Sequence, residues 1–353
     1  MPETLIHPGL FVCPTPIGEY DRIVLGHGSG GRLSANLLRD VFLPAFDNPV
    51  LDRLDDQAVL DIGGAQVAFT TDSFVVKPLF FPGGDIGSLA VHGTVNDLAM
   101  GGATPLYLSA AFIVAEGLPV ATLRRVTASM AEAAAAAGVV IVTGDTKVVE
   151  KGSCDGLFIN TTGIGTVPRG IRLSANQAQP GDLVILSGSL GDHGTAIMAS
   201  REGLEFETTI VTDSAALHWL VADMLAVSSQ IRCLRDPTRG GLASTLNEIA
   251  EQSEVSVEID EKRVFVREEV RGACEMLGLD PLYVANEGKL VAIVPPEIAD
   301  DVLAAMRLNP RGLDAAIIGV VKAGRAGMVT MRTAFGSTRI VDMLAGDQLP
   351  RIC

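Results

Sequence analysis

The stretch Asn96-Asp97-Leu98-Ala99-Met100-Gly101-Gly102 ends a predicted helix that starts near Asp85. Paired glycines are a common C-terminal cap, so the helix is expected to stop there. Asp97 would then lie at the negative end of the helix dipole, where a carboxylate is unfavourable. A divalent cation bound at this helix end would relieve the repulsion.

Predicted strands surround this helix. Two alternating runs, 55–61 and 67–73, are separated by Gly63-Gly64, and such a hairpin would return Asp72 to the neighbourhood of Asp56. Further strands are expected at 106–114, 139–142 and 157–164, with an alanine-rich helix at 120–137. This mixture favours an α+β class, with mixed sheets and flanking helices.

The second half of the chain is organised in a similar way. Strands are expected at 183–187, 255–259, 290–294, 317–321, 328–332 and 339–343, and helices at 192–200, about 213–226, about 241–251, near Glu268 and near Ala299. Prolines and glycines between 168 and 182 mark a domain junction.

We therefore divide the chain into four parts. Residues 1–48 would hold a leader, a short strand at 23–25, a glycine-rich loop and a helix at 33–41. Residues 49–168 and 169–344 would form two α+β domains, as the chain length also suggests. Residues 345–353 would be a mobile tail, since chain ends are poorly ordered unless they are tied down.

Composition excludes several classes of protein. The 353 residues carry a formal net charge of −15 with a pI near 4.7, which disfavours nucleic acid or an anionic membrane as a primary partner. Five cysteines without a C-x-x-C pair fit a reducing cytoplasm better than a disulfide framework. The N-terminus lacks the pattern of a signal peptide, and the most apolar run, 133–142, is too short to span a membrane.

Five acidic residues follow strand or helix ends beside Gly, Thr or Asn: Asp56, Asp72, Asp97, Asp145 and Asp236. Taken singly, each is better explained as a cap or turn residue. As a set they suit Mg²⁺, which takes oxygen ligands and commonly binds together with substrate phosphates. The loop 26–31, with Gly28 and Gly30, could expose backbone N–H groups to a phosphate, although it is not a P-loop.

The last residue, Cys353, follows a polar, proline-containing segment. A thiolate is a nucleophile whose population depends on nearby charge, so a cysteine on a mobile end could carry a chemical group between sites. From the tail alone, a chain that simply happens to stop at Cys is the slightly better explanation.

Several separated motifs, in order, resemble one superfamily. They are Asp55-Asp56-x-Ala-Val, Thr70-Thr71-Asp72-Ser73, Asn96-Asp97-Leu98-Ala99-Met100-Gly101-Gly102, Gly144-Asp145-Thr146-Lys147 and Asp236-Pro237-Thr238-Arg239-Gly240-Gly241-Leu242. Together they resemble the ATP-binding aminoimidazole-ribonucleotide-synthetase-like superfamily. The ending Pro350-Arg351-Ile352-Cys353, with Gly26-His27-Gly28-Ser29-Gly30-Gly31 and Asn286-Glu287-Gly288-Lys289, is similar to its hydrogenase maturation family, HypE.

The resemblance implies a fold and an activity. It implies two α+β domains with a flexible C-terminal tail, a homodimer formed through the sheet of the first domain, and ATP near the subunit boundary. The implied reaction is ATP-dependent dehydration of an S-carboxamide on Cys353 to a thiocyanate, which supplies cyanide for the iron of a nickel–iron hydrogenase. The implied partners are a HypF-type carbamoyltransferase and a HypC–HypD complex that accepts the cyanide.

The resemblance also assigns roles to residues. Asp56, Asp72, Asp97 and Asp236 would hold Mg²⁺, and the nucleotide would be bound by Asp55, Asn96, Asp145 and the loop glycines Gly28 and Gly30. Lys147 and Glu287 would lie beside Cys353. Dehydration needs a base near the amide nitrogen, and Glu287 is our candidate, with Lys147 stabilising the activated oxygen or orienting that acid.

Two other classes of function remain open from the sequence. One is another enzyme of the superfamily, of the selenophosphate-synthetase or thiamine-monophosphate-kinase type. The former would need a reactive Cys in the glycine loop, where this chain has His27 and Ser29. The other is a non-catalytic carrier, in which the tail thiol ferries a group and ATP only shapes the dimer. Without the resemblance, Glu287 and Lys147 would be ordinary loop and turn residues.

Overall fold

The computed structural model describes residues 22–201, 210–344 and 351–353. Its helices are α1 (Arg32–Leu37), α2 (Leu43–Phe46), α3 (Ile86–Met100), α4 (Val120–Ala137), α5 (Asp192–Arg201), α6 (His218–Val227), α7 (Gly241–Gln252), α8 (Glu268–Leu277) and α9 (Pro296–Leu308). The leader 1–21 and most of the predicted tail lie outside the described residues. No helix in the described ranges is long and apolar enough to cross a membrane.

The first sheet has five strands in the order β1-β2-β7-β5-β6. They are β1 (Ala58–Ile62), β2 (Ala65–Phe74), β5 (Thr104–Ala115), β6 (Val140–Val149) and β7 (Leu157–Thr166). All neighbours are antiparallel except β5 and β6, which are joined by the crossover helix α4. The short strands β3 (Phe80–Phe81) and β4 (Gly84–Asp85) form a separate ribbon.

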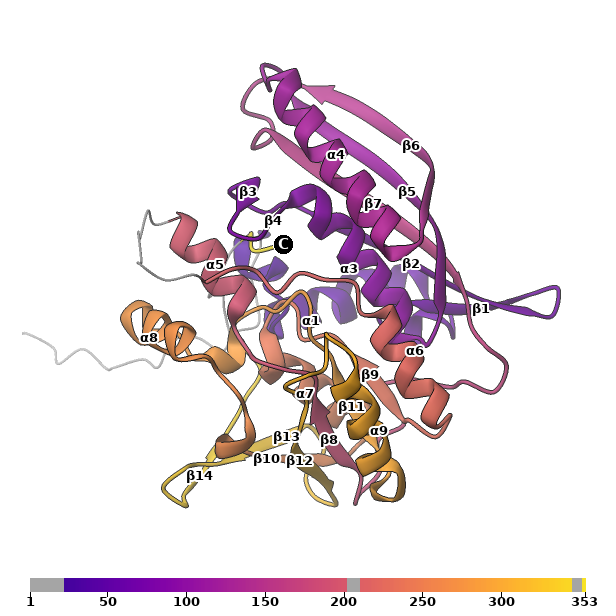
Figure 1. Cartoon of the computed structure of the whole chain (residues 1–353), viewed down its shortest axis with the longest axis vertical. Helices are drawn as coiled ribbons and strands as arrows, with labels where there is room; N and C mark the ends of the chain where they lie inside the picture. The colour runs from indigo at the N-terminus through magenta and orange to yellow at the C-terminus, as the bar shows by residue number, and fades with distance from the viewer. Residues whose placement is uncertain (1–21, 202–209, 345–350) are drawn as a thin grey trace, which may run out of the picture.

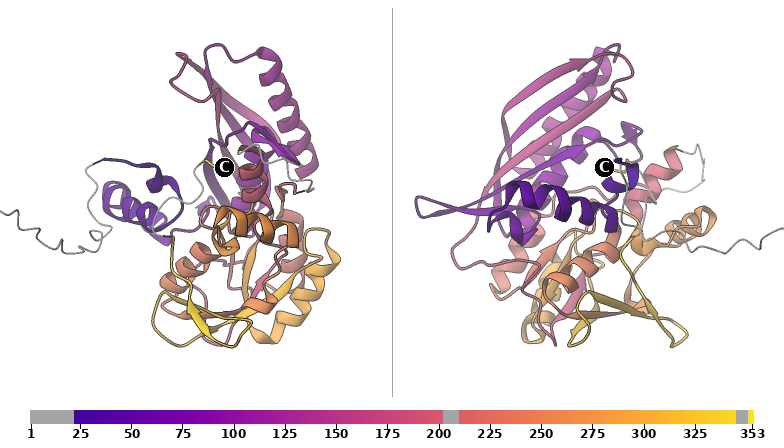
Figure 2. Two further views of the ribbon diagram at one scale, coloured as in Figure 1. Left: turned by 90° about the vertical axis from the view of Figure 1, so that its left-hand side faces the viewer. Right: turned by 180° about the vertical axis from the view of Figure 1, so that it is seen from behind.

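Helices cover only one face of this sheet. α3 packs on β2, β7 and α4, and twelve of its fifteen residues are buried, so the helix is apolar nearly all round. Asp85 caps its N-terminus by accepting hydrogen bonds from the backbone of Gly87 and Ser88. The other face is bare (Figure 2), and every residue from Val140 to Val148 on the edge strand β6 is exposed.

The second sheet has seven strands in the order β14-β13-β10-β12-β8-β11-β9. They are β8 (Leu183–Leu186), β9 (Cys233–Arg235), β10 (Ser256–Asp260), β11 (Val291–Val294), β12 (Ala316–Lys322), β13 (Met328–Arg332) and β14 (Thr338–Ile340). Alternate residues of β8 and β11 face opposite layers, as strand geometry requires. Leu186 and Ile293 join a core with α7 and α8, whereas Ile185 and Ala292 join a core with α6 and α9.

The two sheets lie at opposite ends of the molecule, and the end of the chain lies between them (Figure 1). Helix α6 of the second half packs on α3 and β5 of the first. Two mixed sheets with flanking helices confirm the predicted α+β class.

Some local predictions are wrong. Residues 23–25 form no strand, and a 3₁₀ helix spans Leu25–Gly28 instead. The helix expected from about 213 starts only at His218, because residues 210–217 follow an irregular path that serves the site. Asp145 does not end a strand, since β6 continues beyond it to Val149 in register with β5.

Candidate active site

A polar cavity of about 230 Å³ lies between the two sheets. It is lined by Asp56, Thr71, Asp72, Gly93, Asp97, Asp236, Thr238, Arg239, Glu287 and Cys353. The carboxylates come from the residues before β1, from β2, from the end of α3, from the β9–α7 turn and from the segment before β11. The structure thus brings together all four predicted metal ligands, the predicted base and the predicted thiol.

The carboxylates repel one another in a desolvated space. Burial raises the pKa of Asp97 well above its usual range, and the charges of Asp236, Asp72 and Asp56 add to that rise. Burial likewise raises the pKa of Asp56, against the opposing charge of Arg235, whose Nε lies 3.0 Å from its Oδ1. Asp56 Oδ2 is buried without a hydrogen-bond partner. A site that concentrates negative charge in this way favours a cation.

The donor set suits Mg²⁺ in part. Hard oxygen ligands are present, and an unpartnered carboxylate oxygen points to a missing positive group. Among the described residues, however, no three His, Cys, Asp or Glu groups converge closely enough to hold a metal by themselves. This arrangement suits an ion that also takes oxygens from phosphates and water, as Mg²⁺ usually does.

Glu287 is held by its backbone while its carboxylate is left unpaired. Its N–H donates to Asp213 Oδ1 at 3.1 Å, and its carbonyl accepts from Asn96 Nδ2 at 3.2 Å. The side chain is 3% exposed, and Oε1 has no hydrogen-bond partner. Burial, followed by the charges of Asp236 and Asp72, raises the pKa of Glu287 well above its usual range. A carboxylate of raised pKa is a stronger base than an exposed one.

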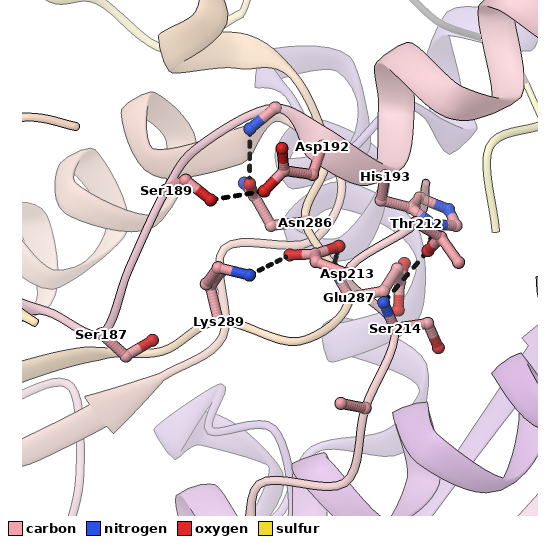
Figure 3. Close-up of polar contacts among 12 residues, drawn as sticks. Ser187, Ser189, Asp192, His193, Thr212, Asp213, Ser214, Asn286, Glu287 and Lys289 are labelled. Carbon is pink, nitrogen blue, oxygen red and sulfur yellow. Dashed lines mark hydrogen bonds and ion pairs between the residues drawn. The ribbon is translucent and has the colours of Figure 1, made fainter. Parts of the chain in front are cut away.

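The glycine that follows Glu287 is required for this path. A Cβ at Gly288 would overlap the backbone oxygen of Asp213. Asp213 also accepts from Lys289 Nζ at 2.9 Å, and Figure 3 shows its carboxylate between Lys289 and Glu287. Both side chains of this ion pair are largely buried.

The last three residues of the chain are docked. The backbone N–H groups of Val75 and Lys77 donate to the carbonyls of Cys353 (3.0 Å) and Arg351 (3.3 Å), an antiparallel pairing that adds the tail to this segment. The Arg351 guanidinium pairs with Asp155. Ile352 is 2% exposed and packs into the core of the first half. The last three residues of the predicted mobile tail, 345–353, are therefore packed against the first half of the chain.

Burial favours the neutral form of the docked thiol. Burial raises the pKa of Cys353 to about 12, although the nearby Arg239 acts in the opposite direction. The sequence left the resting position of the thiol open, and the structure places it in the carboxylate cavity beside Glu287.

Comparison with known proteins identifies the family. Residues 54–167 match the N-terminal domain, and residues 179–332 the C-terminal domain, of the AIR synthase related protein family. The chain is 60% identical over 327 residues to a carbamoyl dehydratase HypE of Azotobacter vinelandii, covering 93% of this chain and 96% of that protein. The chain belongs to the HypE family.

Solved HypE structures agree with the fold. A HypE structure in complex with ATP is 55% identical, with a TM-score of 0.80 over 93% of this chain and 98% of that one. The HypE chain of a HypE–HypF complex is 51% identical, with a TM-score of 0.83 over 87% of this chain and 99% of that one. The two-domain fold predicted from the sequence is thereby confirmed.

Lys147 was expected beside the thiol and Asp145 beside the nucleotide, but both lie away from the carboxylate cavity. Lys147 and Asp145 are on the exposed edge strand β6, where Lys147 Nζ pairs with Asp145 Oδ2 at 2.7 Å. Neither lines the carboxylate cavity. Asp145 instead borders a second cavity, of about 540 Å³, between α4 and the strands β5 and β6.

Asn96 and Asp55 both have hydrogen-bond partners within the chain. The Asn96 amide is 1% exposed, donates to the carbonyls of Ala215 and Glu287, and accepts from the N–H of Leu217. Its hydrogen-bonding capacity is used, so it positions the backbone of Glu287. Asp55 accepts from the hydroxyl of Ser174 (2.9 Å) and from the N–H of Ala175 (3.1 Å). Nucleotide binding by Asn96 and Asp55 stays a prediction.

The glycine loop supports Arg239. The Gly28 carbonyl accepts from Arg239 Nη1 at 3.3 Å. Gly30, at φ +73°, lies so close that a Cβ would stand 2.6 Å from the Arg239 backbone oxygen. Since Arg239 lines the cavity, the loop is adjacent to the site without lining it.

Sequence reasoning missed three residues of this site: His193, Asp213 and Arg239. Arg239 lies within the quoted motif that begins at Asp236, and a basic residue so close to a predicted metal ligand was a usable signal. His193 follows the Gly/Ser-rich run 187–191, which was itself a signal. Asp213 lay inside a predicted helix, and no local pattern pointed to it.

Proposed function

We propose that this chain converts an S-carboxamide on Cys353 into a thiocyanate in an ATP-dependent dehydration, as a carbamoyl dehydratase of hydrogenase maturation. The observation that carries the proposal is the docked chain end, which puts the Cys353 thiol in one cavity with Glu287 and four aspartates. The family relatives named carbamoyl dehydratase HypE and the ATP-bound HypE structure support it.

The net change removes one water from the carboxamide. ATP supplies the phosphoryl group that turns the amide oxygen into phosphate, a competent leaving group. The C–O bond breaks, the nitrogen lone pairs close the C≡N bond, and the two N–H protons must leave. Glu287 is the acceptor for the first of these protons, because its carboxylate is unpaired and its pKa is raised. The products are S-cyano-Cys353, ADP and phosphate.

We propose Mg²⁺ as the second cofactor. Asp56, Asp72, Asp97 and Asp236 would hold it together with nucleotide phosphates, and the ion would offset the charge that accumulates there. Arg239 would remain the resident cation next to the thiol. The same carboxylates explain why the cavity suits a metal–nucleotide complex better than a nucleotide alone, since phosphates and carboxylates repel.

We propose a homodimer formed through the bare face of the first sheet. Large apolar side chains are exposed on this face and on its edge strand β6, including Tyr107, Ile113, Val140 and Val142. A contiguous exposed apolar face of this kind marks an interface. Asp145 and Lys147 would then lie at the subunit boundary, and we propose that they serve nucleotide binding and catalysis from there.

The remaining assignments follow the same family. We propose residues 49–168 as the ATP-binding and dimerisation domain, 169–344 as the second domain, and 345–353 as a mobile carrier. A HypF-type carbamoyltransferase would load the thiol, as the HypE–HypF complex supports. A HypC–HypD complex would accept the cyanide, in the cytoplasm, where free thiols persist.

Intact mass of the full-length protein tests the function. Incubation with the carbamoyl donor system and ATP should add one carboxamide and then remove one water, and Cys353→Ala should show neither change. Phosphate release that requires the carboxamide separates an enzyme from a passive carrier. Carboxamide that persists unchanged in the presence of Mg²⁺ and ATP would refute the proposal.

A further inference from the structure

A buried histidine holds the carbonyl of the residue next to the thiol. His193, in the first turn of α5, is 0% exposed. Its Nε2 lies 3.0 Å from the Ile352 carbonyl oxygen, and its Nδ1 lies 2.7 Å from the Thr212 hydroxyl. Figure 3 shows His193 facing Thr212, with Ser214 below them in the same turn.

The hydrogen-bond partners of His193 determine which of its ring nitrogens carries the hydrogen. A carbonyl oxygen only accepts, so Nε2 carries the hydrogen and donates to Ile352. Nδ1 is then the acceptor, and the Thr212 hydroxyl donates to it. The Thr212 oxygen in turn accepts from the N–H of Ser214 at 3.0 Å. Burial lowers the pKa of His193, which favours this neutral ring.

Hydrogen bonds hold the backbone of the tail on two sides. The three carbonyls of the tail have hydrogen-bond partners in two different segments of the chain. The carbonyls of Arg351 and Cys353 accept from Lys77 and Val75, whereas the carbonyl of Ile352 points the other way, to His193. Without His193, only one side of the backbone would be held near the thiol.

The same turn also holds the base. Residues Thr212 and Asp213 are adjacent, and Asp213 accepts from the N–H of Glu287. One short turn therefore reaches the tail through His193 and reaches Glu287 directly. A shift of His193 would move the thiol relative to Glu287 without touching either side chain.

We propose that His193 is a positioning residue that clamps the Ile352 carbonyl and thereby fixes Cys353 against Glu287. The clamp is independent of what the thiol carries. Its purpose, alignment for dehydration, rests on the proposed function.

The test compares two variants of the full-length, unmodified protein. His193→Phe keeps an aromatic ring against Phe81 and loses both hydrogen bonds, whereas His193→Gln retains one acceptor and one donor. Iodoacetamide labelling, followed peptide by peptide, reports how often Cys353 undocks. The half-buried Cys154 is the internal reference, and the buried Cys233 and Cys274 report global unfolding.

We expect Cys353 in His193→Phe to react about tenfold faster relative to Cys154, the factor that the loss of hydrogen bonds to a buried carbonyl produces. His193→Gln should stay within about threefold of wild type, which a merely structural role for the ring would not predict. Equal rates in all three proteins, or equal acceleration in both variants, would overturn the proposal. If Cys233 also becomes reactive in His193→Phe, that variant unfolds globally. Thr212→Val then replaces it in the labelling comparison, because it removes only the hydroxyl that orients the ring.

A second measurement separates the clamp from the reaction. If the proposed function holds, His193→Phe loaded with the carboxamide should form thiocyanate more slowly, with recovery in His193→Gln. If no protein forms thiocyanate but the labelling pattern holds, the proposed function fails and the clamp stands. If dehydration proceeds normally in a His193→Phe protein whose Cys353 labels fast, the alignment role is refuted.

Discussion

Asp236→Asn is expected to make the ligand-free protein more stable while it abolishes Mg²⁺-dependent ATP turnover. Asp236 lies in the β9–α7 turn, is 8% exposed and lines the carboxylate cavity. Burial raises its pKa to about 6; Arg235 opposes that rise, and the charges of Asp72 and Glu248 contribute to it. Asparagine keeps the size of the side chain and removes the charge.

The sign and the size of this stability change follow from the shift in the pKa of Asp236. The pKa of Asp236 is about 6 in the folded state and 3.8 in an ordinary aspartate, so the folded state binds the proton more tightly than the unfolded state. Stability therefore falls as pH rises from about 4 to about 6 and stays lowered above that. A rise of roughly two units corresponds to about 3 kcal/mol at neutral pH. The variant does not titrate, so it should exceed wild type by about 3 kcal/mol at pH 7.5 and by about half of that at pH 5.

Urea denaturation in the presence of a chelator measures the free energy of unfolding at both pH values. Asp301→Asn, an exposed acid on α9, is the matched control and should change stability at neither pH. A less stable Asp236→Asn protein at pH 7.5, or a gain that is the same at pH 5, would refute the electrostatic reasoning. Retained wild-type ATP turnover would remove Asp236 from the metal site.

Three further outcomes follow from the same geometry. Glu287→Gln should leave the carboxamide on the thiol, with dehydration slowed about 10²–10⁴-fold in a mass time course, and a wild-type rate would exclude this residue as the base. Asp213→Asn strands the largely buried Lys289 and should cost about 3–5 kcal/mol of unfolding free energy, part of which Lys289→Met in the same chain should recover; a neutral single variant would contradict the ion-pair assignment. Val142→Glu should shift the protein toward monomer in sedimentation, whereas Val120→Glu on α4 should not, and an unchanged dimer would argue against the bare sheet face as the interface.

The sequence predicted the convergence of the acids for a local reason. Asp72 and Asp97 lie near the ends of β2 and α3, and a hairpin and a capped helix return such ends to one place. The strand boundaries near Asp145 were harder, because Gly144 and Thr146 resemble a turn, although pairing with β5 extends the strand through them. The pairing of β6 with β5 overrode the local turn propensity at these residues.

The residues that hold the backbone around the site could not be predicted from local patterns. Asn96 was expected to face a nucleotide because the family resemblance assigns it there, but its amide holds backbone from residues more than a hundred positions away. His193 and Asp213 act through similarly distant partners. Such contacts depend on how the two sheets are placed, which no short window of sequence encodes.

The docked chain end has a consequence for substrate delivery. The position of the thiol is set by Arg351 to Cys353, whose backbone and side chains make all the contacts described above. Six residues join Leu344 to this segment. The number of residues in a connecting segment governs the effective concentration of the group that it carries. Added residues lower that concentration only slowly, since each doubling of the segment costs about 0.6 kcal/mol of loop-closure free energy. Reaction geometry and the frequency of delivery are thus encoded in different stretches of the chain, and each can vary without the other.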